Sequence, residues 1–240
     1  MGVSADESFH VGLTPDVVID AAVALTRESH LLTWSIRDLA RRLGVNPSTI
    51  YHHVGGKDLL CRRVVERVAE RLVTPDPALE WQDWFRTLLF EMGPIVMEYP
   101  GTAKWILMHG PTVPAILPAM GSGFIPLSRA GFGEHLPRVI ALLVNTATTT
   151  IAMGDDRLQH EEDGPRDHAA MMRDFERMTI GIPQAEGFAR AMIRPFAAGG
   201  QASHDARVAY YRFAINITIT GLETWLTNGM PDLEESTTAP

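Results

Sequence analysis

Apolar residues recur along the chain at the spacing of one helix face. Between residues 36 and 43 they stand at i, i+3, i+4 and i+7, as Ile36, Leu39, Ala40 and Leu43. Ser35 precedes this stripe and Asp38 follows three residues later, a short variant of the capping box that marks a helix start. Gly44 stands where a left-handed C-cap is needed. The pattern predicts a short helix between Ser35 and Gly44.

The same spacing, interrupted by Gly and Pro, predicts helices over most of the remaining chain. Residues 213–220 also alternate apolar and polar positions as a strand would, but both flanks continue a helical pattern, so we predict helix there. The sequence therefore predicts an all-α protein. The expected helices cover about residues 14–29, 46–54, 57–72, 81–97, 101–109, 114–120, 124–130, 134–153, 166–178, 186–197 and 205–227.

The composition is that of a globular protein. Hydrophobic residues make up 45% and charged residues 21% of the 240 positions. We find no apolar run close to the ~18–20 residues that a membrane span requires, and the polar, acidic start is unlike a signal peptide. One cysteine, Cys61, excludes an intramolecular disulfide and fits a reducing compartment. We therefore expect a soluble, cytoplasmic protein.

Charge is unevenly distributed. The formal net charge of −8 argues against indiscriminate coating of nucleic acid or anionic lipid. Between Arg27 and Arg63, however, seven Lys or Arg stand against three acidic residues. This basic segment fits a localised phosphate contact, with an ordinary solvated face as the alternative.

A short helix with little to bury lies within the basic segment. From Pro47 to Val54 only Ile50 and Val54 are plainly apolar. The helix follows the preceding one after a tight turn at Gly44-Val45, which is the helix-turn-helix arrangement. In that arrangement the second helix presents its first turns to a DNA major groove. The polar composition of this helix favours a surface that contacts a binding partner.

The stretch Ser35–Leu60, SIRDLARRLGVNPSTIYHHVGGKDLL, resembles the TetR family of bacterial transcriptional repressors. Ile50–Leu60 is close to the family pattern Leu-Tyr-x-His-Val/Phe-x-x-Lys-x-x-Leu, and His53-Val54 is most similar to the tetracycline-repressor branch. The similarity covers residues 14–72. It implies a helix-turn-helix DNA-binding domain over 1–60 and a helical ligand-binding and dimerisation domain over 61–230. The composition of residues 231–240 predicts a flexible tail. The resemblance also implies a repressor that binds operator DNA as a homodimer and is released by a small, largely apolar or aromatic molecule.

The resemblance assigns DNA contacts residue by residue. Ser48 and Thr49 open the recognition helix, where hydroxyls reach base edges and the Thr methyl suits thymine. Tyr51 and Lys57 match phosphate-contacting positions. Gly55-Gly56 departs from the family, where Lys or Asn is frequent, and removes possible phosphate contacts. The expected contacts are Arg37, Pro47, Ser48, Thr49, Tyr51, His52 and Lys57.

Two later stretches are candidates for a dimer interface. Val208, Ile215 and Leu222 repeat every seven residues, and small residues around 147–152 permit close helix approach. The family assigns these helices to a four-helix interface, whereas the alternative places both in the intramolecular core. The expected interface residues are Val139, Leu143, Thr146, Tyr211, Ile215, Thr218, Leu222 and Trp225.

The middle of the chain is rich in Met, Trp and Phe with polar residues interleaved. Family members place a small-molecule pocket there, and flexible methionines suit apolar ligands. For any single residue, core packing is the alternative. Pro100–Gly110 is the candidate moving element. The expected ligand contacts are Trp84, Met92, Trp105, Met108, His109, Phe124, Asn145, Thr149, Met172 and Phe175.

Two other function classes are alternatives to a ligand-responsive repressor. An enzyme lacks support, because the chain has no Gly-x-Ser-x-Gly, phosphate-cradling Gly loop or Cys pair. His160-Glu161-Glu162-Asp163 fits a polar loop better than a metal site, since adjacent helical side chains diverge. We therefore expect no catalytic residues, no metal site and no cofactor. The second alternative is an activator or protein-controlled DNA-binding regulator without a small-molecule effector.

Overall fold

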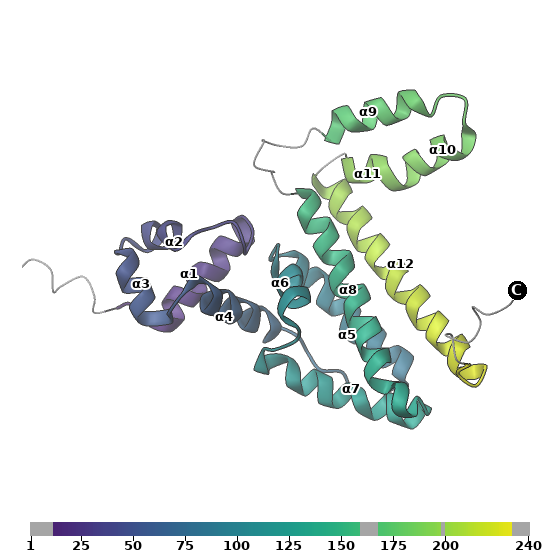
Figure 1. Ribbon diagram of the computed structural model, residues 1–240, viewed down its shortest axis with the longest axis horizontal. Coiled ribbons are helices and arrows are strands. Elements are labelled where there is room, and N and C mark those ends of the chain that lie inside the picture. The colour runs from purple at the N-terminus through teal and green to yellow at the C-terminus, as the bar shows by residue number, and fades with distance from the viewer. Residues whose placement is uncertain (1–11, 159–167, 198–199, 232–240) are drawn as a thin grey trace, which may run out of the picture.

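The computed structural model describes residues 12–158, 168–197 and 200–231, and every regular element in these ranges is helical. The prediction of an all-α fold is confirmed. Figure 1 shows two parts, an N-terminal group of short helices at one end and a bundle of longer helices beside it. Residues 232–240, most of the predicted tail, lie outside the described ranges.

The N-terminal part contains α1 (Pro15–Glu28), α2 (Ile36–Leu43), α3 (Pro47–Val54) and α4 (Lys57–Ala69). Ser35 and Asp38 form the reciprocal capping box at the start of α2. Gly44 ends α2 in the left-handed conformation with φ of 67°, which favours glycine. Asn46 occupies the N-cap of α3 but its side chain accepts no cap hydrogen bond.

The C-terminal part is a bundle around α8 (Leu136–Leu158), which packs on α12 (Gly200–Thr227), α6 (Thr102–His109) and α5 (Trp81–Met97). Residues 213–220 lie inside α12, so the helix prediction there is confirmed. An arm of α9 (His168–Met178), α10 (Pro183–Phe188), a π-helical turn and α11 (Arg194–Ala197) extends beyond the bundle (Figure 1).

One boundary differs from the prediction. The stretches expected at 114–120 and 124–130 form a 3₁₀ turn followed by a single helix, α7 (Leu117–Ala130). Gly123 does not break this helix, because its bare Cα lies against the ring of Trp84. A Cβ built at Gly123 would stand 2.9 Å from that ring. The glycine therefore serves close packing between α7 and α5.

Two apolar cores stabilise the fold, and α4 contributes to both. Val64, Val65 and Ala69 pack in the N-terminal core with α1–α3, whereas Val68 packs in the core of the C-terminal bundle. The N-terminal core also receives Trp105 from α6. A movement of α4 or α6 thus changes the packing of both parts. The predicted boundary between residues 60 and 61 falls inside α4 and stays a prediction.

In the part of the chain described, one stretch is long and apolar enough to cross a membrane by length and composition. It covers residues 133–155, mostly α8, and 39% of its most apolar window is buried inside the protein. In the sequence, Thr and Asn residues interrupt the apolar positions of this stretch, so it contains no continuous apolar run of the length that a membrane span requires. Some apolar residues of α8 remain exposed on the protomer and are therefore available to a second copy.

Candidate DNA-binding surface and ligand cavity

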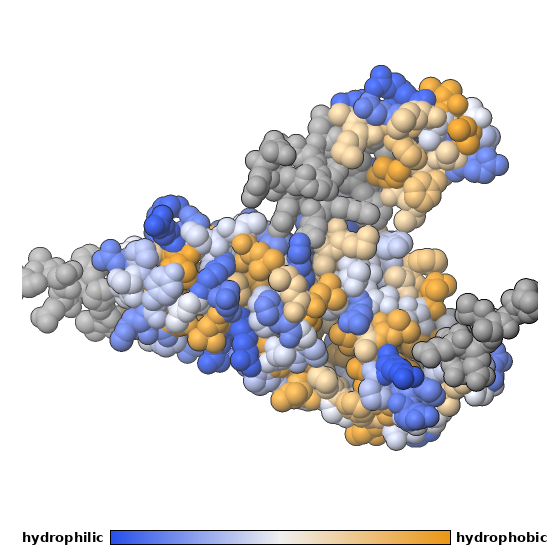
Figure 2. All heavy atoms as spheres, viewed as in Figure 1, coloured by the Kyte–Doolittle hydropathy of each residue, from blue (hydrophilic) through white to orange (hydrophobic). Residues whose placement is uncertain are grey.

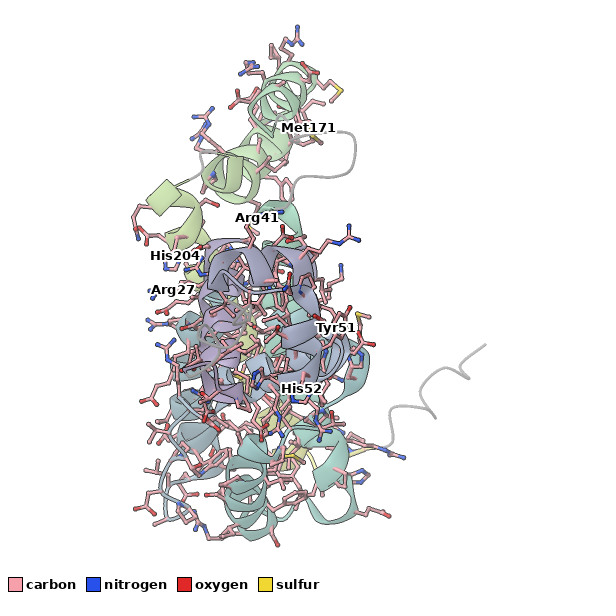
Figure 3. The ribbon with its side chains drawn as sticks, turned by 90° about the vertical axis from the view of Figure 1, so that its left-hand side faces the viewer. Arg27, Arg41, Tyr51, His52, Met171 and His204 are labelled. Atoms are coloured by element: carbon pink, nitrogen blue, oxygen red, sulfur yellow. The ribbon has the colours of Figure 1, made fainter. Side chains whose placement is uncertain are left out.

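Helix α3 presents one face to the domain and another to solvent. Ile50 is fully buried and Val54 nearly so, which fixes the helix against α1 and α2. Pro47, Ser48 and His52 are exposed, Thr49 is half-buried and Tyr51 is 53% exposed. Tyr51 and His52 lie at the end of the molecule that faces the viewer in Figure 3. The polar residues are therefore available to a partner.

The arginines of α2 differ in what they contact. Arg42 forms a two-pronged ion pair with Glu28 of α1 at 2.5 and 2.8 Å, and this pairing lowers the pKa of the Glu28 carboxyl. Arg41 pairs with Asp38 at 3.0 Å. Arg37 is exposed and has no ion-pair partner among the described residues. Of the three, Arg37 is the guanidinium most available to a phosphate.

Lys57 points inward. Its Nζ donates to the carbonyl oxygens of Leu31 at 2.9 Å and Trp34 at 2.6 Å, and lies over the Trp34 ring. Burial lowers the pKa of Lys57 to about 8. The ammonium thus ties the start of α4 to the loop between α1 and α2. A phosphate contact by Lys57 stays a prediction, and in this structure its donors are engaged within the domain.

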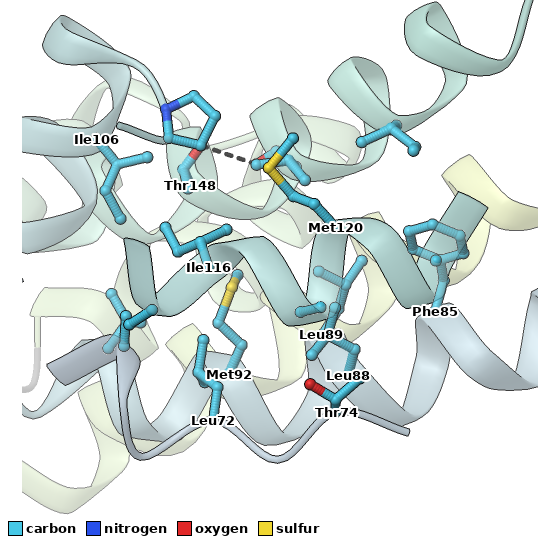
Figure 4. A pocket seen from close by; sticks show the side chains of 18 of the residues that line it. Leu72, Thr74, Phe85, Leu88, Leu89, Met92, Ile106, Ile116, Met120 and Thr148 are labelled. Atoms are coloured by element: carbon cyan, nitrogen blue, oxygen red, sulfur yellow. Dashed lines mark hydrogen bonds between the residues drawn. The ribbon is translucent and has the colours of Figure 1, made fainter. Parts of the chain in front are cut away.

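An apolar cavity with a volume of about 320 Å³ lies between the two parts of the molecule. Its wall combines α4, α5, α6, α7 and α8. Figure 4 shows labelled side chains from α5, α6, α7 and α8, and from the segment that follows α4, converging on it. Leu72, Met92, Ile106, Ile116 and Met120 supply much of the apolar lining. The size and lining suit a drug-sized apolar ligand. Because α4 forms part of the wall, an occupant would touch the helix that adjoins the α2–α3 pair.

Comparison with known proteins agrees with this geometry. Residues 18–64 match the family model of the bacterial regulatory proteins of the tetR family. An HTH-type transcriptional regulator of Saccharopolyspora erythraea is 23% identical over 215 residues, covering 88% of this chain and 87% of the relative. Residues 18–64 are thus a DNA-binding domain of the TetR type. The chain that carries it is a DNA-binding transcriptional regulator and not an enzyme.

Solved structures share the fold of this TetR-type regulator. Apo ActR from Streptomyces coelicolor superposes with a TM-score of 0.67 at 17% identity, covering 90% of this chain and 98% of ActR. ActR in complex with actinorhodin gives a TM-score of 0.66 at 18% identity, covering 92% of this chain and all of that one. At these identities the likeness concerns the fold, including the helical C-terminal part.

Only some predicted ligand residues of this TetR-type regulator line the cavity. Trp84, Met92, Phe124 and Asn145 do. Trp105 is instead buried in the N-terminal core, and His109 stacks on it and donates its Nδ1–H to the Trp105 backbone carbonyl. Met108 and Thr149 point away from the cavity because neighbouring helical residues face different directions. Both side chains are exposed outside the cavity, and Phe175 lies on the α9 arm.

Some predictions fall outside the described side chains, namely Met172 and the segment His160-Glu161-Glu162-Asp163. Sequence reasoning missed the α4 side of the cavity, formed by Val65, Val68, Ala69 and Leu72. The apolar stripe of α4 is visible in the sequence. Nothing in that stripe distinguishes a residue that packs fully from one that borders a void.

The predicted dimer seam of this TetR-type regulator lies inside the protomer. Val139, Leu143, Tyr211, Ile215 and Leu222 are each at most 7% exposed and belong to the core of the bundle. Burial within the protomer leaves these five residues little area for a second copy, and their interface role stays a prediction. The seven-residue repeat arises because α12 packs along α8 and α5 of the same chain. Thr146, Thr218 and Trp225 are half-buried.

A different face of α8 and α12 is uncovered and apolar. On α12, Tyr210, Phe213 and Ile217 stand at i, i+3 and i+7 and are 43%, 61% and 57% exposed. On α8, Leu142 and Met153 stand on one face and are about half exposed. We call these five residues the outer face. Figure 2 shows apolar surface in the C-terminal part, whereas the end formed by α2 and α3 is largely hydrophilic.

A buried ion pair joins α8, α12 and the start of α6. Asp155 on α8 is fully buried, and its Oδ1 accepts from Arg207 Nη2 of α12 at 2.6 Å. Its Oδ2 accepts the backbone N–H of Gly101 at 3.1 Å. Gly101 is the N-cap of α6 with φ of 88°, a conformation suited to glycine. The carboxylate thus holds the first turn of α6 to the bundle.

The N-terminal domain holds the same turn from the other side. The backbone N–H of Leu31 donates to the carbonyl of Pro100 at 2.8 Å. A Cβ built at Gly101 would stand only 2.4 Å from the ring of His30. The turn between α5 and α6 is therefore fixed between the DNA-binding domain and the α8–α12 pair. We call this arrangement the Gly101 junction.

Proposed function

We propose that the protein is a repressor that binds operator DNA as a homodimer in the bacterial cytoplasm. A small, largely apolar or aromatic molecule in the cavity releases it from DNA. Residues 1–60 read DNA, and residues 61–230 bind the ligand and the second copy. The observation that carries the proposal is the wall shared between the cavity and α4, through Val65, Val68 and Ala69. A ligand that fills the cavity acts on α4, the helix that directly follows α2 and α3. We call the α2–α3 pair the reading head.

The proposed DNA reading follows from the exposed side of α3. Ser48 and Thr49 in its first turn reach base edges, and Tyr51 donates its hydroxyl to a phosphate. Pro47 and His52 are exposed beside them. Arg37 supplies a positive charge from α2. The acidic remainder of the molecule disfavours contact with DNA elsewhere, which directs binding to this end.

The proposed dimer uses the outer face of α8 and α12. Apolar side chains more than 40% exposed at helical spacing on two adjacent helices are the arrangement that a four-helix interface covers. A second copy placed there extends a bundle whose inner sides are already packed. Two copies also supply two reading heads for two half-sites, which a single short recognition helix requires for specific binding.

The proposed response is a shift between two conformations. One conformation of the dimer matches the spacing of the two half-sites, and the other does not. The ligand binds the second conformation more tightly than the first, and it weakens DNA binding only by the ratio of its affinities for these two conformations. Thr102 and Ile106 of α6 line the cavity, directly after the Gly101 junction. Occupation of the cavity therefore acts on α4 and α6 together.

The test is an anisotropy titration of labelled DNA from the region flanking the protein's own gene. N-phenyl-1-naphthylamine, a neutral aromatic probe, is added at a concentration that saturates the cavity by its own fluorescence. We expect specific binding that steepens at low salt and weakens when the probe is bound. An affinity for DNA that ignores every molecule shown to occupy the cavity contradicts the proposed response.

A further inference from the structure

The cavity carries no ionisable side chain. Its lining residues all lie in the described part of the chain, and Asp, Glu, Lys, Arg and His are absent from them. The polar side chains that border it are Thr74, Thr102, Asn145 and Thr148, together with the indole of Trp84. A ligand inside this cavity would therefore meet no counter-ion.

Three of the polar side chains at the cavity already donate their hydrogens within the protein. The Trp84 indole N–H donates to the carbonyl of Pro75 at 3.1 Å, and the Thr102 hydroxyl to that of Tyr99 at 2.7 Å. The Thr148 hydroxyl donates to the carbonyl of Val144 at 2.8 Å. The two Thr hydroxyls consequently offer a ligand acceptor lone pairs, and neither they nor the Trp84 indole offers a free hydrogen.

Asn145 differs from these groups. Its amide makes no hydrogen bond to the described residues, and the side chain is exposed while it borders the cavity. Phe124, Pro137 and Ala141 are also both exposed and lining, so these residues mark the opening of the cavity between α7 and α8. The Asn145 amide is therefore a donor and acceptor placed at that opening.

Resting on the function proposed above, we propose that the cavity selects uncharged ligands and that Asn145 is their polar anchor. An ionised group inside loses its hydration and gains no opposite charge, whereas a neutral ring system of the same shape bears no such cost. The acceptor-rich wall favours ligands that donate hydrogen bonds, such as phenols and aromatic amines. Carboxylates, sulfonates and ammonium compounds of similar size are excluded.

Two probes that share one ring skeleton test the exclusion of charge. N-phenyl-1-naphthylamine is neutral, and 1-anilinonaphthalene-8-sulfonate is the same molecule with a sulfonate. By fluorescence titration of the full chain, we expect the sulfonate to bind at least about 100-fold more weakly. Ala119→Trp places an indole in the cavity between α7 and α5 and should abolish binding of the neutral probe. Met92→Trp replaces that variant if its circular dichroism differs from the wild type.

A charge placed at Asn145 tests the anchor. Asn145→Lys supplies a counter-ion at the opening and should strengthen binding of the sulfonate by at least tenfold. The same variant removes the anchoring amide and should weaken binding of the neutral probe by about fivefold. Ser128→Lys adds the same charge one helical turn from Phe124, outside the cavity lining, and should leave the sulfonate affinity unchanged. Equal rescue by both variants overturns the role of Asn145.

The remaining outcomes separate the two proposals. Equal affinity of wild type for both probes, with each displacing the other, overturns the selection of uncharged ligands and leaves a ligand-responsive regulator standing. If neither the neutral probe nor the sulfonate binds, the cavity is not a ligand site. That result also overturns the proposed release from DNA on ligand binding. Weak sulfonate binding rescued only by Asn145→Lys supports the inference.

Discussion

Lys57 shows how one side chain fixes the geometry of the reading head. Its ammonium joins two backbone carbonyls from the loop between α1 and α2 and covers the face of Trp34. The lysine belongs to α4, so the bond sets the position of α4 relative to the loop that leads into α2. A lysine at this position of the motif suggests a phosphate contact when only the sequence is known, because the sequence does not give the direction of the side chain.

The first prediction separates the two roles by salt dependence. Lys57→Met should lower the free energy of unfolding by about 1–3 kcal/mol, because the buried carbonyl of Trp34 loses its donor. The slope of log affinity for DNA against log salt should stay within error of wild type. Arg37→Ala should reduce that slope by about one unit, since its exposed guanidinium neutralises one phosphate. A reduced slope for Lys57→Met, measured by anisotropy, would restore its phosphate role.

The second prediction concerns pH. The pKa of Lys57 is about 8 in the folded protein and close to its ordinary value in the unfolded chain, so the unfolded chain binds more protons between these values. The stability of wild type relative to Lys57→Met should therefore rise as pH increases through 8 toward 10. Urea unfolding of both proteins at several pH values measures the difference. A difference that is constant over this range contradicts the assigned environment.

The third prediction concerns base reading. Thr49→Ala should change the preference at one position of each half-site by roughly 1 kcal/mol or more, because the side chain meets a base edge. Tyr51→Phe should instead weaken binding to all sequences alike, because its hydroxyl meets a phosphate. Binding to a library of half-site variants distinguishes the two patterns. Equal losses for Thr49→Ala on operator and random DNA contradict base contact.

Helix α6 is the element on which the two parts of the molecule meet. Asp155 holds its first turn to α8 and α12, the Pro100 carbonyl joins it to the N-terminal domain, and Trp105 packs in the N-terminal core. Its middle borders the cavity through Ile106. A short helix fixed at these points transmits a displacement instead of absorbing it. The Gly101 junction is therefore where we expect ligand and DNA binding to be coupled.

The fourth prediction tests this junction. Asp155→Asn leaves the Arg207 guanidinium buried without its counter-ion and should lower the free energy of unfolding by about 3–5 kcal/mol. Asp155→Asn with Arg207→Met removes both charges and should cost less than the sum of the two single changes. In the double variant, N-phenyl-1-naphthylamine should still bind but should alter DNA affinity less than in wild type. An unchanged response contradicts coupling through this pair.

At the scale of the whole molecule, the uncovered surface defines how copies assemble. The outer face lies on the two longest helices, whose inner faces form the core. The stretch that includes α8 is apolar enough to resemble a membrane span, yet it packs against α5, α6 and α12. A second copy would cover its remaining apolar side chains. The reading heads of such a pair would be linked through the bundle.

The fifth prediction concerns assembly. Phe213→Asp and Ile217→Asp should each convert the dimer to monomer in sedimentation velocity, because an aspartate replaces an apolar contact at the proposed interface. DNA binding should weaken in parallel, since two half-sites are no longer read together. Val73→Asp places the same charge on an exposed apolar residue between α4 and α5 and should leave the dimer intact. Dimeric Phe213→Asp protein would place the interface elsewhere.

The local structure of the reading head follows from nearby residues alone. Ser35, Asp38 and Gly44 define α2 through bonds that span three or four positions, so the sequence suffices to predict them. The all-α class follows from helical spacing for the same reason. The order of polar and apolar residues in α3 likewise determines which side faces the domain, because the helix repeats every 3.6 residues.

Only the tertiary structure decided which neighbours each apolar stripe meets. The repeat that includes Tyr211 and Ile215 serves the protomer's own core, and residues one or two positions away form the outer face. The inward course of Lys57 and the pairing of Asp155 with Arg207 also depend on segments distant in sequence. Periodicity gives the direction of a side chain around its helix, but the partner across that face depends on how whole helices pack. For that reason the α4 wall of the cavity was visible only once α4, α6 and α8 were placed together.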